Sequence, residues 1–215
     1  MSGTRKPYRR VPSGFRFTRR EIRDLLVAWL ALGVAFVLFL DRGELLAALR
    51  GPDSGAAVVL SLLLARALIT VGIGFLLHEL AHKALAVRFG QIAEFRADYN
   101  MLGLAIVAAL AGFLFAAPGA VYHQGQISER ENGLIALAGP LTNVALAAVF
   151  VPITLIPGFV GSVGGLGVLV NLILAAFNMI PYGPLDGRTV IRWSKVVYVA
   201  VAAPTIGLAV WALFL

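Results

Sequence analysis

Two histidines and a glutamate form the most reactive pattern in the sequence. His78, Glu79 and His82 occur in the run His-Glu-Leu-Ala-His, inside a long apolar stretch that favours a helix. Positions four apart share one face of a helix, so both imidazoles can bind one zinc ion while the adjacent carboxylate reaches a water molecule on that ion. The pattern therefore predicts a hydrolytic zinc site, with His78 and His82 as ligands and Glu79 as the general base.

A third ligand is needed, because a catalytic zinc ion usually has three protein ligands and one open position. The chain has no cysteine, so this ligand must offer nitrogen or oxygen. Asp186 is favoured because it follows Pro181 and Pro184, which break a helix and leave irregular backbone that a membrane tolerates only beside a cavity. His123 is the alternative ligand, and Asp186 would otherwise only cap the helix expected to start near Arg188.

The composition places these residues in a membrane. Of 215 residues, 60% are hydrophobic and 13% are charged, whereas a soluble domain carries about 25% charged residues. A helix needs about 20 apolar residues to cross the hydrocarbon layer. The sequence therefore predicts an all-α integral membrane protein with five to six transmembrane helices. The apolar runs that supply them are 25–40, 56–77 continuing to 90, 101–117, 133–156, 163–181 and 196–215.

The run 101–117 is predicted to enter and leave the membrane on the same face. With five other runs crossing, this arrangement puts fifteen of the eighteen Lys and Arg residues on the cytoplasmic side, as the positive-inside rule favours. The segments on either side, Ala93–Tyr99 and Phe113–His123, alternate like short strands and predict a small β-hairpin around the re-entrant element. Arg66 is expected at the outer boundary of its helix, because a buried arginine in lipid is costly.

The first 24 residues form a basic segment with eight Lys and Arg residues. Ahead of a hydrophobic span, such a segment marks the cytoplasmic side and contacts anionic lipid, so nucleic acid is not expected as a partner. No cleavage site of a signal peptide is evident, so the first span is expected to be retained. We therefore predict a disordered cytoplasmic tail over 1–24 and a single membrane-embedded metalloprotease domain over 25–215.

The motifs resemble the site-2 protease family of intramembrane zinc metalloproteases, in its compact prokaryotic or archaeal form. The resemblance rests on His78–His82 and on a second pattern that runs from Asn178 through two prolines to Leu185-Asp186-Gly187. A weaker element is Ala138–Asn143. The resemblance implies that Asn178 and Asn143 position the substrate backbone or polarise its carbonyl group. Hydrogen bonding between helices is the alternative role for both asparagines.

The expected activity is zinc-dependent endoproteolysis of transmembrane segments in other proteins, with one zinc ion per chain. The active site is expected to open to the cytoplasm of a prokaryotic cell, in a multi-pass protein of the plasma membrane. A helical substrate has no free backbone donors, so it must unwind before cleavage. A strand near 93–99 or 113–123 offers an edge that could capture the unwound segment.

Three other functions use some of the same features. Another membrane peptidase with the His-Glu-x-x-His motif, such as a prenyl-protein protease, would typically take a glutamate as third ligand. A divalent-metal transporter would usually show repeated halves with paired broken helices, which the sequence lacks. An inactive scaffold would have no need of Glu79, because a structural zinc site requires no base.

Overall fold

Helices dominate the computed structural model, which describes residues 14–50, 55–113 and 118–214. Five helical stretches there are long and apolar enough to cross a membrane. They are Arg19–Leu40 (α1), Ala56–Arg88 (α3 Ala56–Ala67, a π-helical turn Leu68–Gly72 and α4 Ile73–Arg88), Glu129–Leu155 (α6 Glu129–Phe150 with a 3-10 turn Val151–Leu155), Phe159–Asn178 (α7) and Lys195–Leu213 (α9). The prediction of an all-α, multi-pass membrane protein is confirmed.

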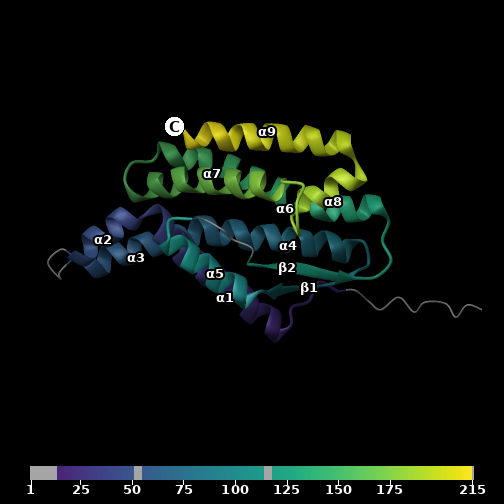
Figure 1. Cartoon of the computed structure of the whole chain (residues 1–215), viewed down its shortest axis with the longest axis horizontal. Helices are drawn as coiled ribbons and strands as arrows, with labels where there is room; N and C mark the ends of the chain where they lie inside the picture. The colour runs from purple at the N-terminus through teal and green to yellow at the C-terminus, as the bar shows by residue number, and fades with distance from the viewer. Residues whose placement is uncertain (1–13, 51–54, 114–117, 215) are drawn as a thin grey trace, which may run out of the picture.

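Shorter elements complete the chain between these helices. They are α2 (Arg42–Arg50), β1 (Ile92–Ala97), α5 (Tyr99–Leu110), β2 (Gly119–Gln124) and α8 (Asp186–Trp193). In Figure 1, α9 covers α6 and α7, and α4 runs through the middle of the molecule. The helices α1 and α5 lie side by side below α4, next to the two strands.

The strands pair as an antiparallel two-stranded sheet, as the alternation predicts. Ile92 lies opposite Gln124, and Ala97 lies opposite Gly119. The segment between the strands therefore starts and ends at the same end of the sheet, as a re-entrant element requires. Its helix α5 has 12 residues and is about 18 Å long, which is too short to cross a hydrocarbon layer of ~30 Å. Part of the predicted strand 113–123, residues 114–117, lies outside the described residues.

The first helix begins inside the segment predicted to be a tail. Thr18 caps α1 by accepting a hydrogen bond from the Glu21 backbone N–H, and Glu21 and Asp24 are each only 1% exposed. Residues 19–24 therefore belong to the folded domain, and only residues 1–13 of the predicted tail lie outside the described chain. The basic composition concealed this start, because the two buried acids stand among four exposed arginines, namely Arg16, Arg19, Arg20 and Arg23.

Arg66 lies where α1 and α3 meet. Its guanidinium group pairs with the Asp41 carboxylate, directly after the end of α1. A cationic side chain within a long apolar helix thus has an acidic partner, which lowers the cost of its partial burial.

Candidate metal centre

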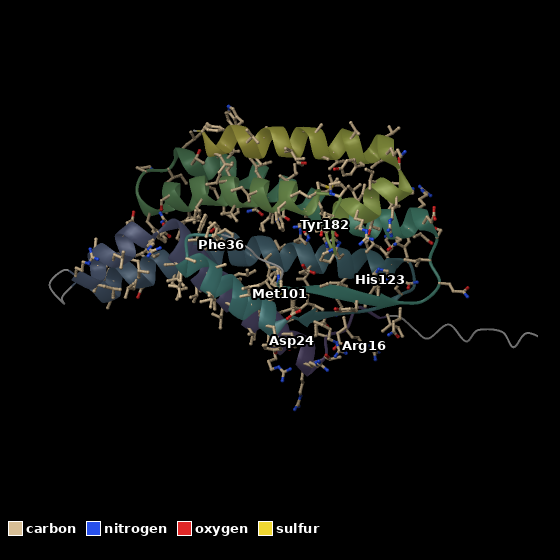
Figure 2. All side chains as sticks on the ribbon, viewed as in Figure 1. Arg16, Asp24, Phe36, Met101, His123 and Tyr182 are labelled. Atoms are coloured by element: carbon tan, nitrogen blue, oxygen red, sulfur yellow. The ribbon has the colours of Figure 1, made fainter. Side chains whose placement is uncertain are left out.

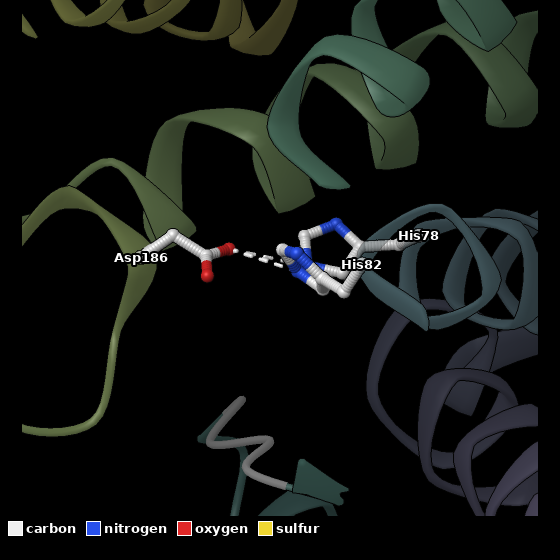
Figure 3. Close-up of side chains that lie close together, drawn as sticks. All are labelled: His78, His82 and Asp186. Carbon is white, nitrogen blue, oxygen red and sulfur yellow. Dashed lines mark hydrogen bonds and ion pairs between the residues drawn. The ribbon is translucent and has the colours of Figure 1, made fainter. Parts of the chain in front are cut away.

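Helix α4 presents His78 and His82 on one face. The two Nε2 atoms lie 3.0 Å apart, and the side chains are almost completely buried. Asp186 reaches them from the start of α8: its Oδ2 atom lies 3.3 Å from each Nε2 atom (Figure 3). The structure therefore brings together the three residues predicted as ligands, from elements that are more than 100 positions apart in sequence.

The position of Asp186 follows from the broken helix that precedes it. Helix α7 ends at Asn178, and Gly183 adopts a left-handed conformation with φ of 58°. Gly187 then packs tightly on the end of α7, because a Cβ atom there would lie 2.2 Å from the Met179 carbonyl oxygen. These contacts hold the start of α8 against the end of α7.

The alternative roles considered for Asp186 and His123 do not fit this geometry. The N-cap of α8 is Leu185, and the Asp186 side chain points to the two imidazoles rather than capping the helix. His123 lines the same cavity, but it is not part of the cluster whose ligand atoms all lie within 4.8 Å of one another. Among the described residues, only His78, His82 and Asp186 form such a cluster.

Hydrogen bonds to the other ring nitrogens orient both imidazoles. The Nδ1 atom of His78 lies 2.5 Å from Asn143 Oδ1, and Nδ1 of His82 lies 2.7 Å from the Ile135 carbonyl oxygen. Both partners are acceptors, so each Nδ1 donates its proton and each Nε2 keeps a free lone pair. The two lone pairs converge on one point, as metal coordination requires.

The amide of Asn143 is itself held in place. Its Nδ2 group donates to the Gly74 carbonyl oxygen at 3.2 Å and to Asn171 Oδ1 at 2.9 Å. Asn171 in turn donates to the Gly167 carbonyl oxygen within α7, and both asparagines are fully buried. This chain of bonds leaves Oδ1 of Asn143 as the acceptor for His78.

The contacts of Asn143 thus differ from the substrate contact that the resemblance implies. Its oxygen and both amide hydrogens are engaged within the protein, so no polar group remains for a substrate carbonyl. Its Oδ1 atom instead orients the ring of His78. Asn178, by contrast, lines the cavity, and its side chain makes a bond of 2.9 Å to the Leu174 carbonyl oxygen.

Three observations fit a zinc ion at this point. Tetrahedral zinc with bonds of about 2.05 Å requires ligand atoms about 3.3 Å apart, close to the spacings found here. Asp186 Oδ2 is buried and has no hydrogen-bond partner, although two nitrogens face it. Finally, a Cβ atom on Gly139 would lie 2.4 Å and 2.5 Å from the Nε2 atoms of His82 and His78, so only glycine leaves this point free.

The cluster opens into a cavity of about 310 Å³. Glu79 lies in its wall and is 8% exposed, close to the two histidines on the same helix. The cavity also contacts residues of α1, β2, α6, α7 and α8, so elements from the whole fold meet at the cluster. A buried carboxylate next to a three-ligand metal site is the arrangement that hydrolytic metalloenzymes use.

Comparison with known proteins agrees with this chemistry. The chain is 41% identical over 205 residues to a protein of Methanocaldococcus jannaschii named "Putative zinc metalloprotease MJ0611". The alignment covers 93% of this chain and 98% of that relative. The chain belongs to this zinc metalloprotease family.

A second member of the zinc metalloprotease family gives a shorter match. A protein of Mycobacterium tuberculosis named "Putative zinc metalloprotease Rip3" is 36% identical to the chain over 166 residues. These residues are 74% of this chain and 38% of Rip3. No family model matches the sequence, and no solved structure matches it significantly. The near full-length match to MJ0611 is consistent with the compact form of site-2 protease that the motifs predict.

Two groups of residues around the site of this metalloprotease were not predicted from the sequence. Asn171 escaped notice, although a single asparagine within an apolar span is costly unless it is bonded. The second group is a buried ion pair between Lys83, next to His82, and Glu21, with Nζ 2.5 Å from Oε2. The spacing of Glu21 and Asp24 on one face of a helix was the available signal for the acidic partner.

Proposed function

We propose that this zinc metalloprotease is an intramembrane endopeptidase that cleaves transmembrane segments of other proteins. The observation that supports this most strongly is the position of the site among long apolar helices. Its two histidines lie within a helix long enough to span a membrane, and both are buried beside a cavity that other long apolar helices line. A protease that acts on soluble chains has no need to enclose its site in this way.

The reaction would be hydrolysis of a peptide bond, with His78, His82 and Asp186 holding the metal. A bound zinc ion lowers the pKa of water to about 7 and polarises a carbonyl group. Glu79 would take the proton from the attacking water and then deliver it to the nitrogen of the leaving amine as the C–N bond breaks. Asn143 keeps the His78 ring in the tautomer that leaves Nε2 free for the metal.

Asn178 is proposed to position the substrate at this site. It stands at the end of α7, where the helix gives way to the segment leading to Asp186. One of its amide hydrogens is used by the Leu174 carbonyl oxygen, which leaves a second N–H for the substrate. The amide dipole would then act on the same carbonyl group as the metal.

Strand addition to the sheet is the proposed mode of substrate capture. The outer edge of β1 is already occupied: the Phe95 N–H donates to Glu21 at 3.0 Å, and the Ala97 N–H donates to Asp24 at 3.3 Å. Two carboxylates of α1 thus take the bonds that a further strand would make. This leaves the outer edge of β2 as the place for an unwound substrate.

The free edge of β2 also faces the site. The backbone N–H groups of Phe95 and Ala97 point away from β2, toward α1. In an antiparallel ladder, the residues opposite them then also point their backbone groups away from the partner strand. These are Val121 and Gly119, and His123 follows in the same alternation. All three line the cavity that contains Glu79 and the three metal ligands. A strand bound here would lie beside the reactive groups.

The orientation is proposed from charge. The exposed arginines near the start of α1 would face the cytoplasm of a prokaryotic cell and contact anionic lipid of the plasma membrane. The metal site would then open toward the cytoplasm.

The proposed function is tested by the position of the cut. The purified protein would be reconstituted in liposomes with a protein that has a single transmembrane helix, and the products would be mapped by mass spectrometry. Cleavage inside the apolar span is the expected result, and helix-breaking residues in the span should raise the rate. Cleavage confined to soluble loops would refute the intramembrane activity, and zinc uptake without cleavage would favour a transporter.

A further inference from the structure

The third histidine of the chain lies in the same cavity as the other two. His123 is on β2, beside α4, and its side chain is partly buried in the wall of the cavity (Figure 2). It is not part of the metal cluster, and no hydrogen bond joins its ring to another described residue. An imidazole that faces a reactive cavity and has no such partner in the described part of the chain is available for a bound ligand.

The cavity has few groups that can stabilise negative charge. Glu79 and Asp186 are acidic, and no lysine or arginine is found among its described lining residues. Apart from the metal ligands, the side chains there with an N–H donor are His123, Asn132 and Asn178. When water adds to a peptide carbonyl group, the oxygen becomes negative, so a donor close to it lowers the barrier.

The strand register brings His123 close to the proposed substrate. His123 is two residues after Val121 in β2, so its backbone N–H and C=O groups also point to the free edge of that strand. Its side chain lies on the same face of the sheet as Val121, which packs on the core cluster that includes Phe75 of α4. Tyr122, between them, points to the opposite face and is 64% exposed.

We propose that His123 is a catalytic residue that donates a hydrogen bond from its imidazole to the carbonyl oxygen of the scissile peptide. This inference rests on the proposed function, because it requires a peptide strand along β2. Asn178 approaches the cavity from the end of α7, so the carbonyl oxygen would meet donors from two walls.

A neutral ring is sufficient for this role. Burial in the wall of the cavity lowers the pKa of His123. This favours the neutral ring, in which one of the two nitrogens still carries a proton to donate.

The test compares His123→Ala, His123→Gln and Tyr122→Ala in liposomes with a cleavable transmembrane substrate. Tyr122→Ala is the matched control, because it truncates a side chain on the opposite face of the same strand. For His123→Ala we expect kcat to fall about 100-fold, with zinc content unchanged and KM within about threefold of wild type. Glutamine keeps an N–H donor, so the kcat of His123→Gln should be about tenfold higher than that of His123→Ala.

Three other outcomes would overturn the inference. A kcat for His123→Ala equal to that of the Tyr122→Ala control would show that the ring does not contact the reacting group. Loss of zinc in parallel with activity would make His123 a support of the metal site instead. A rise in KM with unchanged kcat would limit the ring to substrate binding. If the wild-type protein cleaves no transmembrane substrate, the proposed function itself fails, which is distinct from these results.

Discussion

Replacing Gly139 with alanine would put a methyl group where the metal ion must lie. The new Cβ atom would be 2.4 Å from His82 Nε2 and 2.5 Å from His78 Nε2. A carbon atom in ordinary contact needs about 3.5 Å, so both rings would have to retreat by about 1 Å. Helix α6 carries Gly139 and also the Ile135 and Asn143 groups that hold these rings, so it cannot simply move away.

The size of the effect follows from the tolerance of metal coordination. Zinc–nitrogen bonds vary by about 0.2 Å, and a displacement of 1 Å at two ligands exceeds this several times. Disturbing groups that merely orient a ligand already weakens binding 10- to 100-fold. We therefore expect the zinc affinity of Gly139→Ala to fall at least about 100-fold, with cleavage lost in parallel.

The assay is competition for zinc with a chelator of known affinity, together with circular dichroism to monitor helix content. Gly165→Ala in α7 is the matched control, because a Cβ atom there has no neighbour within 4 Å. It should bind zinc like the wild type. If Gly139→Ala also bound zinc with wild-type affinity and kept its helix content, the metal could not lie between the two Nε2 atoms.

The remaining predictions concern the residues around the site. Asn143→Ala removes the acceptor for His78 Nδ1, so zinc affinity should fall about 10- to 100-fold in the same assay; unchanged affinity would show that the bond is not needed. Lys83→Met leaves Glu21 buried without its countercharge, which should cost about 3–5 kcal/mol of unfolding free energy in detergent, and Glu21→Gln in the same chain should recover part of it. A stability equal to wild type would contradict the burial of this pair. Val121→Pro removes a backbone N–H from the free edge of β2 while sparing the ladder, so KM should rise with zinc content unchanged; an unchanged KM would argue against strand capture. Removing zinc with a chelator should abolish cleavage, and added zinc should restore it; cleavage that survives removal would exclude a metal-dependent reaction.

Local patterns were sufficient to predict the parts of the structure that depend on short stretches of sequence. A spacing of four residues places His78 and His82 on one face of a helix whatever surrounds it. Proline and glycine mark the break before Asp186 for a similar reason, since they interrupt the helix itself. The two strands around α5 were also predicted, because their alternation is a property of each strand.

The roles that depend on packing between helices could not be predicted in this way. For Asn143 both a substrate contact and a bond between helices stayed open, because the sequence does not say which face of α6 meets α4. Glu21 and Asp24 were placed in a tail, because exposed arginines surround them and their partners, Phe95 and Ala97, are about 70 residues away. Both cases concern buried polar groups whose partners only the folded chain brings close.

The central claim is tested most directly by Glu79→Gln, compared with Asp186→Asn and the wild type. Each protein would be purified, its zinc content measured, and its cleavage of a transmembrane substrate followed in liposomes. We predict that Glu79→Gln keeps its zinc and loses cleavage by several orders of magnitude, because the ligands remain and the base is lost. Asp186→Asn should lose most of its zinc and most of its cleavage activity. Cleavage by Glu79→Gln at the wild-type rate, or a wild-type protein that binds no zinc, would contradict the account.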